Sequence, residues 1–231
     1  MIRAILFDFD GVLVPIDREI QRKMKQSMVK KYSLSRSLTR EQAKSHVENA
    51  IKESEIDEAY FKIADAAVKI GSHNKGEMNA LFHTLTRKRS PKLQKRIFEM
   101  LNRLHERGLT LGVVTLSSKD RIEQVLKDMR VREHFCFVES AASELQKASR
   151  SEWKRAAYKK FLDKYGFKPR EVLSVGDSFI IDLEPARELG MQTALITDYS
   201  YKKTQHKRSL ADYDVPRRML PKTLLTIFGS K

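Results

Sequence analysis

Short apolar segments recur along this chain and are separated by stretches with helical periodicity. A strand buried on both faces of a parallel sheet reads as a near-continuous apolar run. The first segment, IRAILFDF, is the clearest of these and ends just before Gly11. The expected strands are Ile2–Phe9, Thr110–Leu116 and Glu171–Val175, with weaker signals at His134–Val138 and Gln192–Thr197.

Helical patterns lie between these segments. Apolar residues recur at spacings of three and four within Arg121–Met129, Ser151–Tyr165 and Leu183–Leu189, and glycines at 166 and 190 follow the last two as stop signals. Residues 220–228 are expected to close the core. Alternating strands and helices predict an α/β fold, a Rossmann-like doubly wound parallel sheet.

Residues 16–108 contain no convincing strand. Thr39 is a helix-start signal and Gly71 a helix-stop signal within this region. The helix expected near Ser90–Arg107 leads straight into a strand, so it is assigned to the α/β core. A crossover needs only about a dozen residues. We therefore expect a core domain of residues 1–15 and 89–231, with residues 16–88 inserted as a separate helical domain.

Composition excludes several classes of protein. No apolar stretch approaches the roughly 20 residues of a membrane helix, and two acids interrupt the N-terminal run, so neither a membrane span nor a signal peptide is expected. The single cysteine, Cys136, rules out an internal disulfide and a Cys-rich zinc site. It lies in an apolar segment and is expected to be buried rather than reactive. A cytoplasmic location is the simplest expectation.

The chain carries a formal net charge of +15, with the basic surplus in residues 16–108 and 199–231. A basic surface attracts phosphorylated metabolites, nucleic acid or anionic lipid. The alternative is an ordinary solvated, lysine-rich surface. Because no basic stripe is interleaved with aromatic residues, the sequence supports a nucleic-acid partner only weakly.

Acidic residues follow two of the expected strands. Asp8 and Asp10 come directly after the first strand, and Asp177 and Asp182 follow the strand that ends near Val175. Open α/β sheets place their sites beyond the carboxyl ends of the strands. Four converging carboxylates repel one another and raise each other's pKa, and a hard cation such as Mg²⁺ resolves this repulsion. The alternative for the first pair is a turn or helix-cap role.

Hydroxyl groups end a third strand, in the segment Thr115-Leu116-Ser117-Ser118. A strand-end hydroxyl followed by the first amides of a helix is suited to binding an anion. Considered alone, an ordinary helix cap is the more common explanation.

Together these segments resemble a known family. DFDGVLV, VVTLSS and VGDSFIIDLEPARELG are similar to motifs one, two and four of the haloacid dehalogenase-like hydrolase superfamily. The inserted helical block resembles the cap of its phosphoglycolate phosphatase and β-phosphoglucomutase branch. The resemblance runs through the whole chain in order and spacing, apart from the inserted helices.

The resemblance implies a role for each matching residue. Asp8 corresponds to the nucleophile that forms an aspartyl-phosphate, and Asp10 to the general acid and base. Asp8, Asp177 and the backbone carbonyl of Asp10 are implied Mg²⁺ ligands, supported by Asp182. Thr115, followed by Leu116 and Ser117, corresponds to the phosphate-binding segment.

The cation of the family's third motif is where this sequence departs from the pattern. Relatives usually carry Lys-Pro before the helix that precedes motif four, but here the region reads SELQKASRSEWKRAAYKKFL. Lys147, in the expected loop, is the first candidate for a catalytic, phosphate-binding cation. Lys154, in the first helical turn, is the second, and Arg150 the third. A solvated side chain is the alternative for each.

The leading hypothesis is a Mg²⁺-dependent phosphatase acting on a small phosphorylated metabolite through an aspartyl-phosphate on Asp8. A phosphomutase of the β-phosphoglucomutase type is the alternative within the same chemistry. A polynucleotide phosphatase, a nucleic-acid-binding protein, or a binding protein that has lost turnover are alternatives of other classes. Specificity is expected to reside in residues 16–88, and the sequence does not indicate the substrate.

Overall fold

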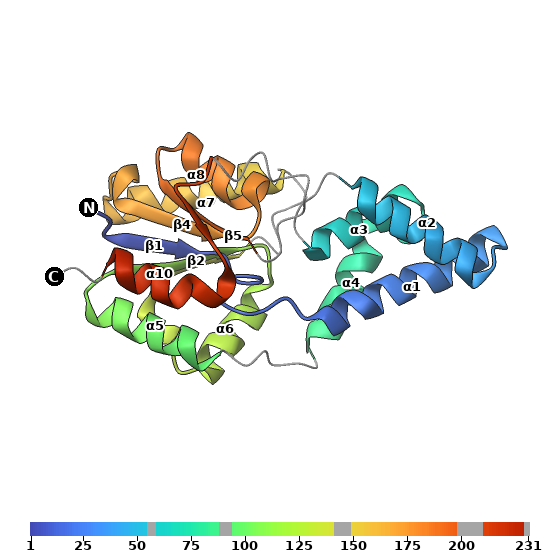
Figure 1. Ribbon diagram of the computed structural model, residues 1–231, viewed down its shortest axis with the longest axis horizontal. Coiled ribbons are helices and arrows are strands. Elements are labelled where there is room, and N and C mark those ends of the chain that lie inside the picture. The colour runs from blue at the N-terminus through green and yellow to red at the C-terminus, as the bar shows by residue number, and fades with distance from the viewer. Residues whose placement is uncertain (55–58, 88–93, 141–148, 198–209, 229–231) are drawn as a thin grey trace. The chain divides into compact units, whose positions relative to one another are not determined.

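The computed structural model describes residues 1–54, 59–87, 94–140, 149–197 and 210–228 (Figure 1). The chain divides into two compact units. One contains residues 1–15 and 91–231, and the other contains residues 16–90. The boundary expected between residues 88 and 89 lies outside the described residues.

The larger unit is built on a six-stranded sheet in the order β3-β2-β1-β4-β5-β6, in which all neighbouring strands are parallel. This is the order of a doubly wound α/β fold, so the predicted fold class is confirmed. The strands are β1 (Ala4–Phe7), β2 (Thr110–Thr115), β3 (Phe135–Ser140), β4 (Val172–Gly176), β5 (Gln192–Ile196) and β6 (Tyr213–Val215).

Each strand expected from the apolar runs is present, shorter by a few residues or displaced by one or two. The first, β1, is fully buried and pairs with β2 on one side and β4 on the other. Two details differ from expectation. The edge strand β6 was not foreseen, because three residues are too few for a periodicity. Cys136 is exposed, not buried, because it is the extra residue of a β-bulge in edge strand β3: Phe135 pairs with Leu111 and Phe137 with Gly112, and Cys136 lies between them.

Helices cover both faces of this sheet (Figure 1). Apolar residues of α5 (Lys95–Glu106), α6 (Lys119–Asp128) and α10 (Leu220–Ile227) join one hydrophobic core with the strands. The opposite face is covered by α7 (Arg150–Tyr165) and α8 (Glu184–Glu188). Ser149 and Glu152 form a capping box at the start of α7, and Gly166 ends it with a φ of 68°.

The described part of the smaller unit consists of helices and the turns between them. Its helices are α1 (Arg18–Arg36), α2 (Arg40–Glu53), α3 (Ala59–Lys69) and α4 (Lys75–Arg87). Thr39 caps α2 in a capping box with Gln42, as its sequence pattern indicates. Buried residues from each helix form its interior, among them Met24, Met28, Val47, Ile63 and Met78. Among all the described helices of both units, none is long and apolar enough to cross a membrane.

Candidate active site

The site lies at the carboxyl ends of the three central strands. Asp8 directly follows β1, Thr115 is the last residue of β2, and Asp177 directly follows β4. The direction of strand order reverses between β1 and β4, and doubly wound folds bind ligands in the crevice at that point. The amide of Asp8 donates to the carbonyl of Val175 at 2.8 Å, which extends the pairing of the two strands to the site itself.

Three carboxylates converge in this crevice. Asp8, Asp177 and Asp182 each offer an oxygen within 4.8 Å of the others, and all three are buried. A π-helical turn over Phe179–Leu183 carries Asp182, whose Oδ2 accepts the backbone N–H of Ser178 at 3.0 Å. Such turns are rare and recur at functional sites. Of the four acids predicted to converge, these three form one cluster.

Two glycines make this approach possible. A Cβ on Gly11 would lie 2.1 Å from Oδ2 of Asp177, and the residue has a φ of 91° that favours glycine. A Cβ on Gly176 would lie 2.3 Å from the Cβ of Asp182. In each of the motifs Asp-Gly and Gly-Asp, the aspartate is therefore accompanied by a glycine whose missing side chain leaves room for a second carboxylate.

One lysine lies inside the acidic cluster. The Nζ of Lys154 is 2.7 Å from Oδ1 of Asp8 and 2.6 Å from Oδ1 of Asp182, and it donates to the carbonyl of Val114 at 2.6 Å. Its side chain is only 1% exposed. Burial alone lowers the pKa of this ammonium, but the charges of Asp182 and Asp8 outweigh burial and raise the pKa well above its usual value. Lys154 is therefore a fixed positive charge.

The three candidate cations of the sequence differ in what the structure says about them. Lys147 lies outside the described residues. Arg150 begins α7, one turn before Lys154. Lys154, the second candidate, contacts the cluster. In the sequence, only its expected place in the first turn of the helix made it a candidate.

Burial also perturbs Asp8. Its pKa is raised to about 7, because burial and the negative charge of Asp182 outweigh the stabilising charge and hydrogen bond of Lys154. One ammonium accompanies three carboxylates in this cluster, so these four groups carry a formal charge of −2. The oxygens of buried carboxylates are the ligands that Mg²⁺ accepts, and a divalent cation matches that charge. The cluster thus fits a divalent metal ion.

Asp10 is held apart from this cluster by an arginine. Arg121, in the first turn of α6, donates from Nη2 to Oδ1 of Asp10 at 2.7 Å and from Nη1 to Oδ2 at 2.8 Å. The hydroxyl of Ser117 also donates to Oδ2. Arg121 has no recognisable signal in the sequence, because a single arginine on a helix resembles a solvated residue.

The predicted phosphate-binding segment lies beside Asp10. Oγ1 of Thr115 accepts the backbone N–H of Ser117 at 3.2 Å, an arrangement that shapes the turn after β2. Oγ of Ser140 in turn donates to the carbonyl of Ser117 at 2.5 Å. Thr115, Leu116 and Ser117 are all buried. The segment therefore combines hydroxyl groups and backbone amides at the end of β2, next to both Asp8 and Asp10 in the sheet.

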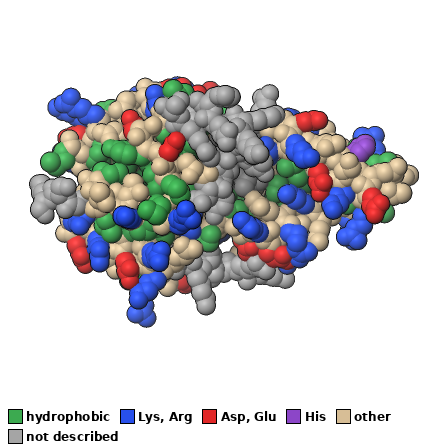
Figure 2. All heavy atoms as spheres, viewed as in Figure 1, with side chains coloured by type: hydrophobic (Ala, Val, Ile, Leu, Met, Phe, Trp, Pro, Cys, Tyr) green, Lys and Arg blue, Asp and Glu red, His purple; other side chains and the backbone are tan. Residues whose placement is uncertain are grey.

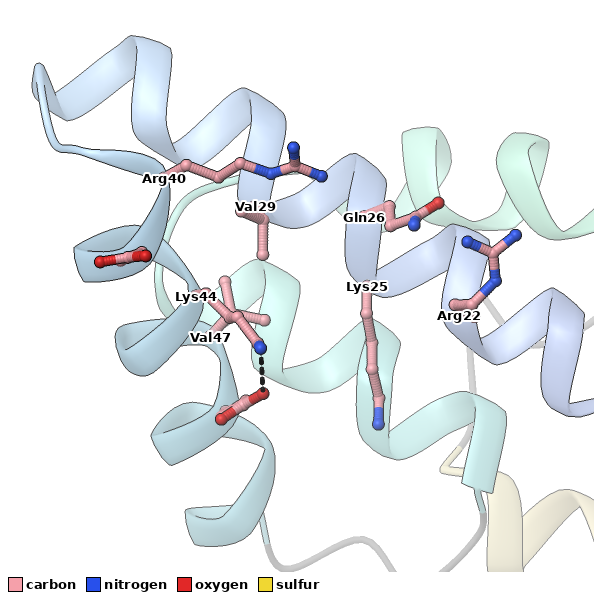
Figure 3. Close-up of a pocket in the computed structure, with 9 residues that line it drawn as sticks. Arg22, Lys25, Gln26, Val29, Arg40, Lys44 and Val47 are labelled. Atoms are coloured by element: carbon pink, nitrogen blue, oxygen red, sulfur yellow. Dashed lines mark ion pairs between the residues drawn. The ribbon is translucent and has the colours of Figure 1, made fainter.

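The helical unit contains a separate cavity of about 490 Å³ between α1 and α2. Figure 3 shows Val29 and Val47 between these helices, with the basic side chains of Arg22, Lys25 and Arg40 around them. Arg22 is already bound to Glu19 at 2.5 Å, and Lys44 lies 4.0 Å from Glu48. On the face shown in Figure 2, Lys and Arg side chains are interspersed with acids rather than gathered in one patch.

Comparison with known proteins shows a match to a protein family. A family model described as haloacid dehalogenase-like hydrolase matches residues 5–196. Phosphoglycolate phosphatase from Synechococcus elongatus is 29% identical over 101 residues, which make up 44% of this chain and 44% of that enzyme. The chain thus aligns with less than half the length of this curated relative.

Solved structures match over nearly the whole chain. The HAD phosphatase from Thermococcus onnurineus is 21% identical with a TM-score of 0.61, and the alignment covers 96% of this chain and 98% of that one. A predicted phosphoglycolate phosphatase from Haemophilus somnus is 19% identical with a TM-score of 0.63 at the same coverage. A magnesium-bound HAD-hydrolase from Bacillus subtilis is 13% identical with a TM-score of 0.58, covering 99% of both chains. At identities this low, the similarity shows that this chain has the same fold as these three proteins.

Proposed function

We propose that this chain, which belongs to the haloacid dehalogenase-like hydrolase family, is a Mg²⁺-dependent phosphatase that hydrolyses a small phosphomonoester through an aspartyl-phosphate. The observation that carries the proposal is the buried cluster of Asp8, Asp177 and Asp182 with Lys154 inside it. The names of the phosphatases that it resembles support the same chemistry.

Asp8 is the proposed nucleophile. Its Oδ1 is bound by Lys154, which leaves Oδ2 as the oxygen to attack phosphorus. As the bond between Oδ2 and phosphorus forms, the bond to the leaving oxygen breaks, and Asp10 gives that oxygen a proton. Asp10 then accepts a proton from water while the water oxygen bonds to phosphorus and releases Asp8. The ester and water become alcohol and inorganic phosphate.

Positive charge is the other requirement of phosphoryl transfer, because negative charge gathers on the phosphoryl oxygens. Lys154 supplies one charge beside the nucleophile. Asp8 and Asp177, with Asp182 and the carbonyl of Asp10, are the residues proposed to hold Mg²⁺. When bound, the ion neutralises carboxylate and phosphate charge. Thr115 and the amides after it are proposed to bind the phosphate.

A single assay tests the central claim. Purified protein is incubated with an aryl phosphate and Mg²⁺, and then with sugar phosphates, phosphoglycolate and nucleotides. We expect phosphate release that needs Mg²⁺ and is abolished by Asp8→Asn. Release of phosphate to water rather than transfer between sugar positions distinguishes the phosphatase from a phosphomutase. Absence of turnover across the whole panel contradicts the proposal.

The two lysine candidates are compared directly. We expect Lys154→Ala to lose turnover by about 10²-fold or more, as expected for a positive charge lost at a phosphoryl-transfer site. Lys147→Ala is expected to keep most of it. The reverse result would return the role to Lys147.

A further inference from the structure

The arginine that binds Asp10 has no role in the function proposed so far. Arg121 forms a two-point fork with both oxygens of Asp10, at 2.7 and 2.8 Å. Its side chain is 13% exposed and that of Asp10 is 8% exposed, so water competes little for these bonds. A two-point arginine–carboxylate pair fixes geometry as well as charge.

Arg121 is itself held from two other sides. Its Nη1 donates to Oγ of Ser117 at 2.9 Å, and its guanidinium carbon lies 5.4 Å from the centre of the Phe9 ring. Ser117 donates to the same oxygen of Asp10, so three hydrogen bonds reach this carboxylate. The carboxylate of Asp10 is therefore held in a fixed plane and direction.

We propose that Arg121 is a positioning residue that aims the carboxyl group of Asp10 at the leaving-group oxygen. This inference rests on the proposed function, in which Asp10 exchanges the proton. Proton transfer needs a heavy-atom separation of about 2.6–3.2 Å with good alignment, which a freely rotating carboxyl group meets only part of the time. When Asp10 is protonated, its proton replaces one of the three hydrogen-bond donors that reach the carboxyl group. The other two donors still fix the plane of that group.

The leaving group provides the readout. A nitrophenolate leaves without help, whereas an alkoxide must be protonated as it departs. In the first step, which kcat/KM reports, a residue that aims the proton donor therefore matters for alkyl phosphates and little for nitrophenyl phosphate. The second step, in which Asp10 accepts a proton from water, is the same for both substrates. A merely structural ion pair would lower kcat/KM equally for both.

The experiment measures kcat and KM for p-nitrophenyl phosphate and for an alkyl phosphate that the enzyme accepts. For Arg121→Ala we expect kcat/KM to fall by about 10²-fold with the alkyl phosphate and only a few-fold with the nitrophenyl ester, because general acid catalysis contributes about that factor. Arg121→Lys keeps the charge but not the fork, so it should be intermediate, and it also covers the case in which the alanine variant folds poorly.

Asp10→Asn provides the reference, and the double variant tests the coupling. If Arg121 acts through Asp10, Asp10→Asn shows the same leaving-group dependence and adding Arg121→Ala causes no further loss. Arg132→Ala is the matched control, because it removes an arginine bound to Glu123 at 2.6 Å near the opposite end of α6. It should leave both substrates unaffected.

The outcomes separate the two proposals. If Asp10→Asn shows the leaving-group dependence and Arg121→Ala does not, the positioning role is wrong and the proposed function stands. If Asp10→Asn shows none, the acid role of Asp10 is wrong and the role of Arg121 fails with it. Equal losses of kcat/KM on both substrates for Arg121→Ala also overturn the inference.

Discussion

Lys154→Met removes the one ammonium that contacts the acidic cluster among the described residues, and replaces it with an apolar side chain of similar length. Three short contacts are lost, to Asp8, Asp182 and the carbonyl of Val114. Because Lys154 is 1% exposed, water cannot take its place without opening the core. The carboxylates of Asp8 and Asp182 would then lie close together in a buried site without the positive charge of Lys154.

The cost follows from this burial. Removing one partner of a buried ion pair typically destabilises a protein by about 3–5 kcal/mol. For a chain of this size each kcal/mol corresponds to a fall in Tm of about 2–4 °C. We therefore expect Tm to fall by about 6–20 °C without metal. The loss should be smaller at pH 5 than at pH 8, because a protonated Asp8 needs no counter-charge.

Thermal unfolding followed by circular dichroism, at both pH values and with and without Mg²⁺, measures this effect. Lys160→Met is the matched control on the same helix, because Lys160 is 60% exposed and pairs with Glu139 at the surface. Its cost should stay below about 1 kcal/mol. Equal losses of Tm for the two variants, or a Lys154 loss that does not depend on pH, would refute the reasoning.

Three further predictions concern the same site. Gly11→Ala should abolish the rise in Tm caused by Mg²⁺, because its Cβ would lie 2.1 Å from Asp177; Gly108→Ala, with a φ of 74° and open space, should cost about 1 kcal/mol and keep that rise. Burial raises the pKa of Asp8 to about 7. Metal-free stability should therefore fall as pH rises from about 4 to 7, and the Mg²⁺-induced rise in Tm should grow from pH 5.5 to 8; a rise that is the same at both pH values contradicts this. Tyr158→Phe removes hydrogen bonds to a backbone carbonyl of the π-helical turn and to a serine of β4, which should lower the free energy of unfolding in urea by about 1 kcal/mol.

The sheet and the acidic cluster were predictable because their signals are local. An apolar run identifies β1 whatever surrounds it, and parallel strands bring their carboxyl ends to one edge. The proximity of Asp8 and Asp177 could therefore be predicted although 169 residues separate them in the sequence. The strand β6 could not be predicted in this way, because Tyr213, Asp214 and Val215 are held by pairing with β5 rather than by a pattern of their own.

The cations were harder to identify because a positive side chain gains its role only from its partners. Lys154 lies on a helix with many lysines, and only the tertiary contacts with Asp8 and Asp182 distinguish it. Arg121 lies 111 residues from Asp10, and no motif connects the two. Buried charge pairs of this kind depend on how two secondary-structure elements pack together. That packing leaves no periodic pattern in the sequence of either element.

The pairing of β1 with β4 joins the first residues of the chain to residues near position 175. Synthesis must therefore reach β4, about three quarters along the chain, before β1 gains one of its two neighbours. Until then Asp8 lacks the buried surroundings that raise its pKa, and no product that ends before Asp182 can assemble the cluster. Turnover would consequently report the completion of folding, since contacts so distant in sequence form late and slowly.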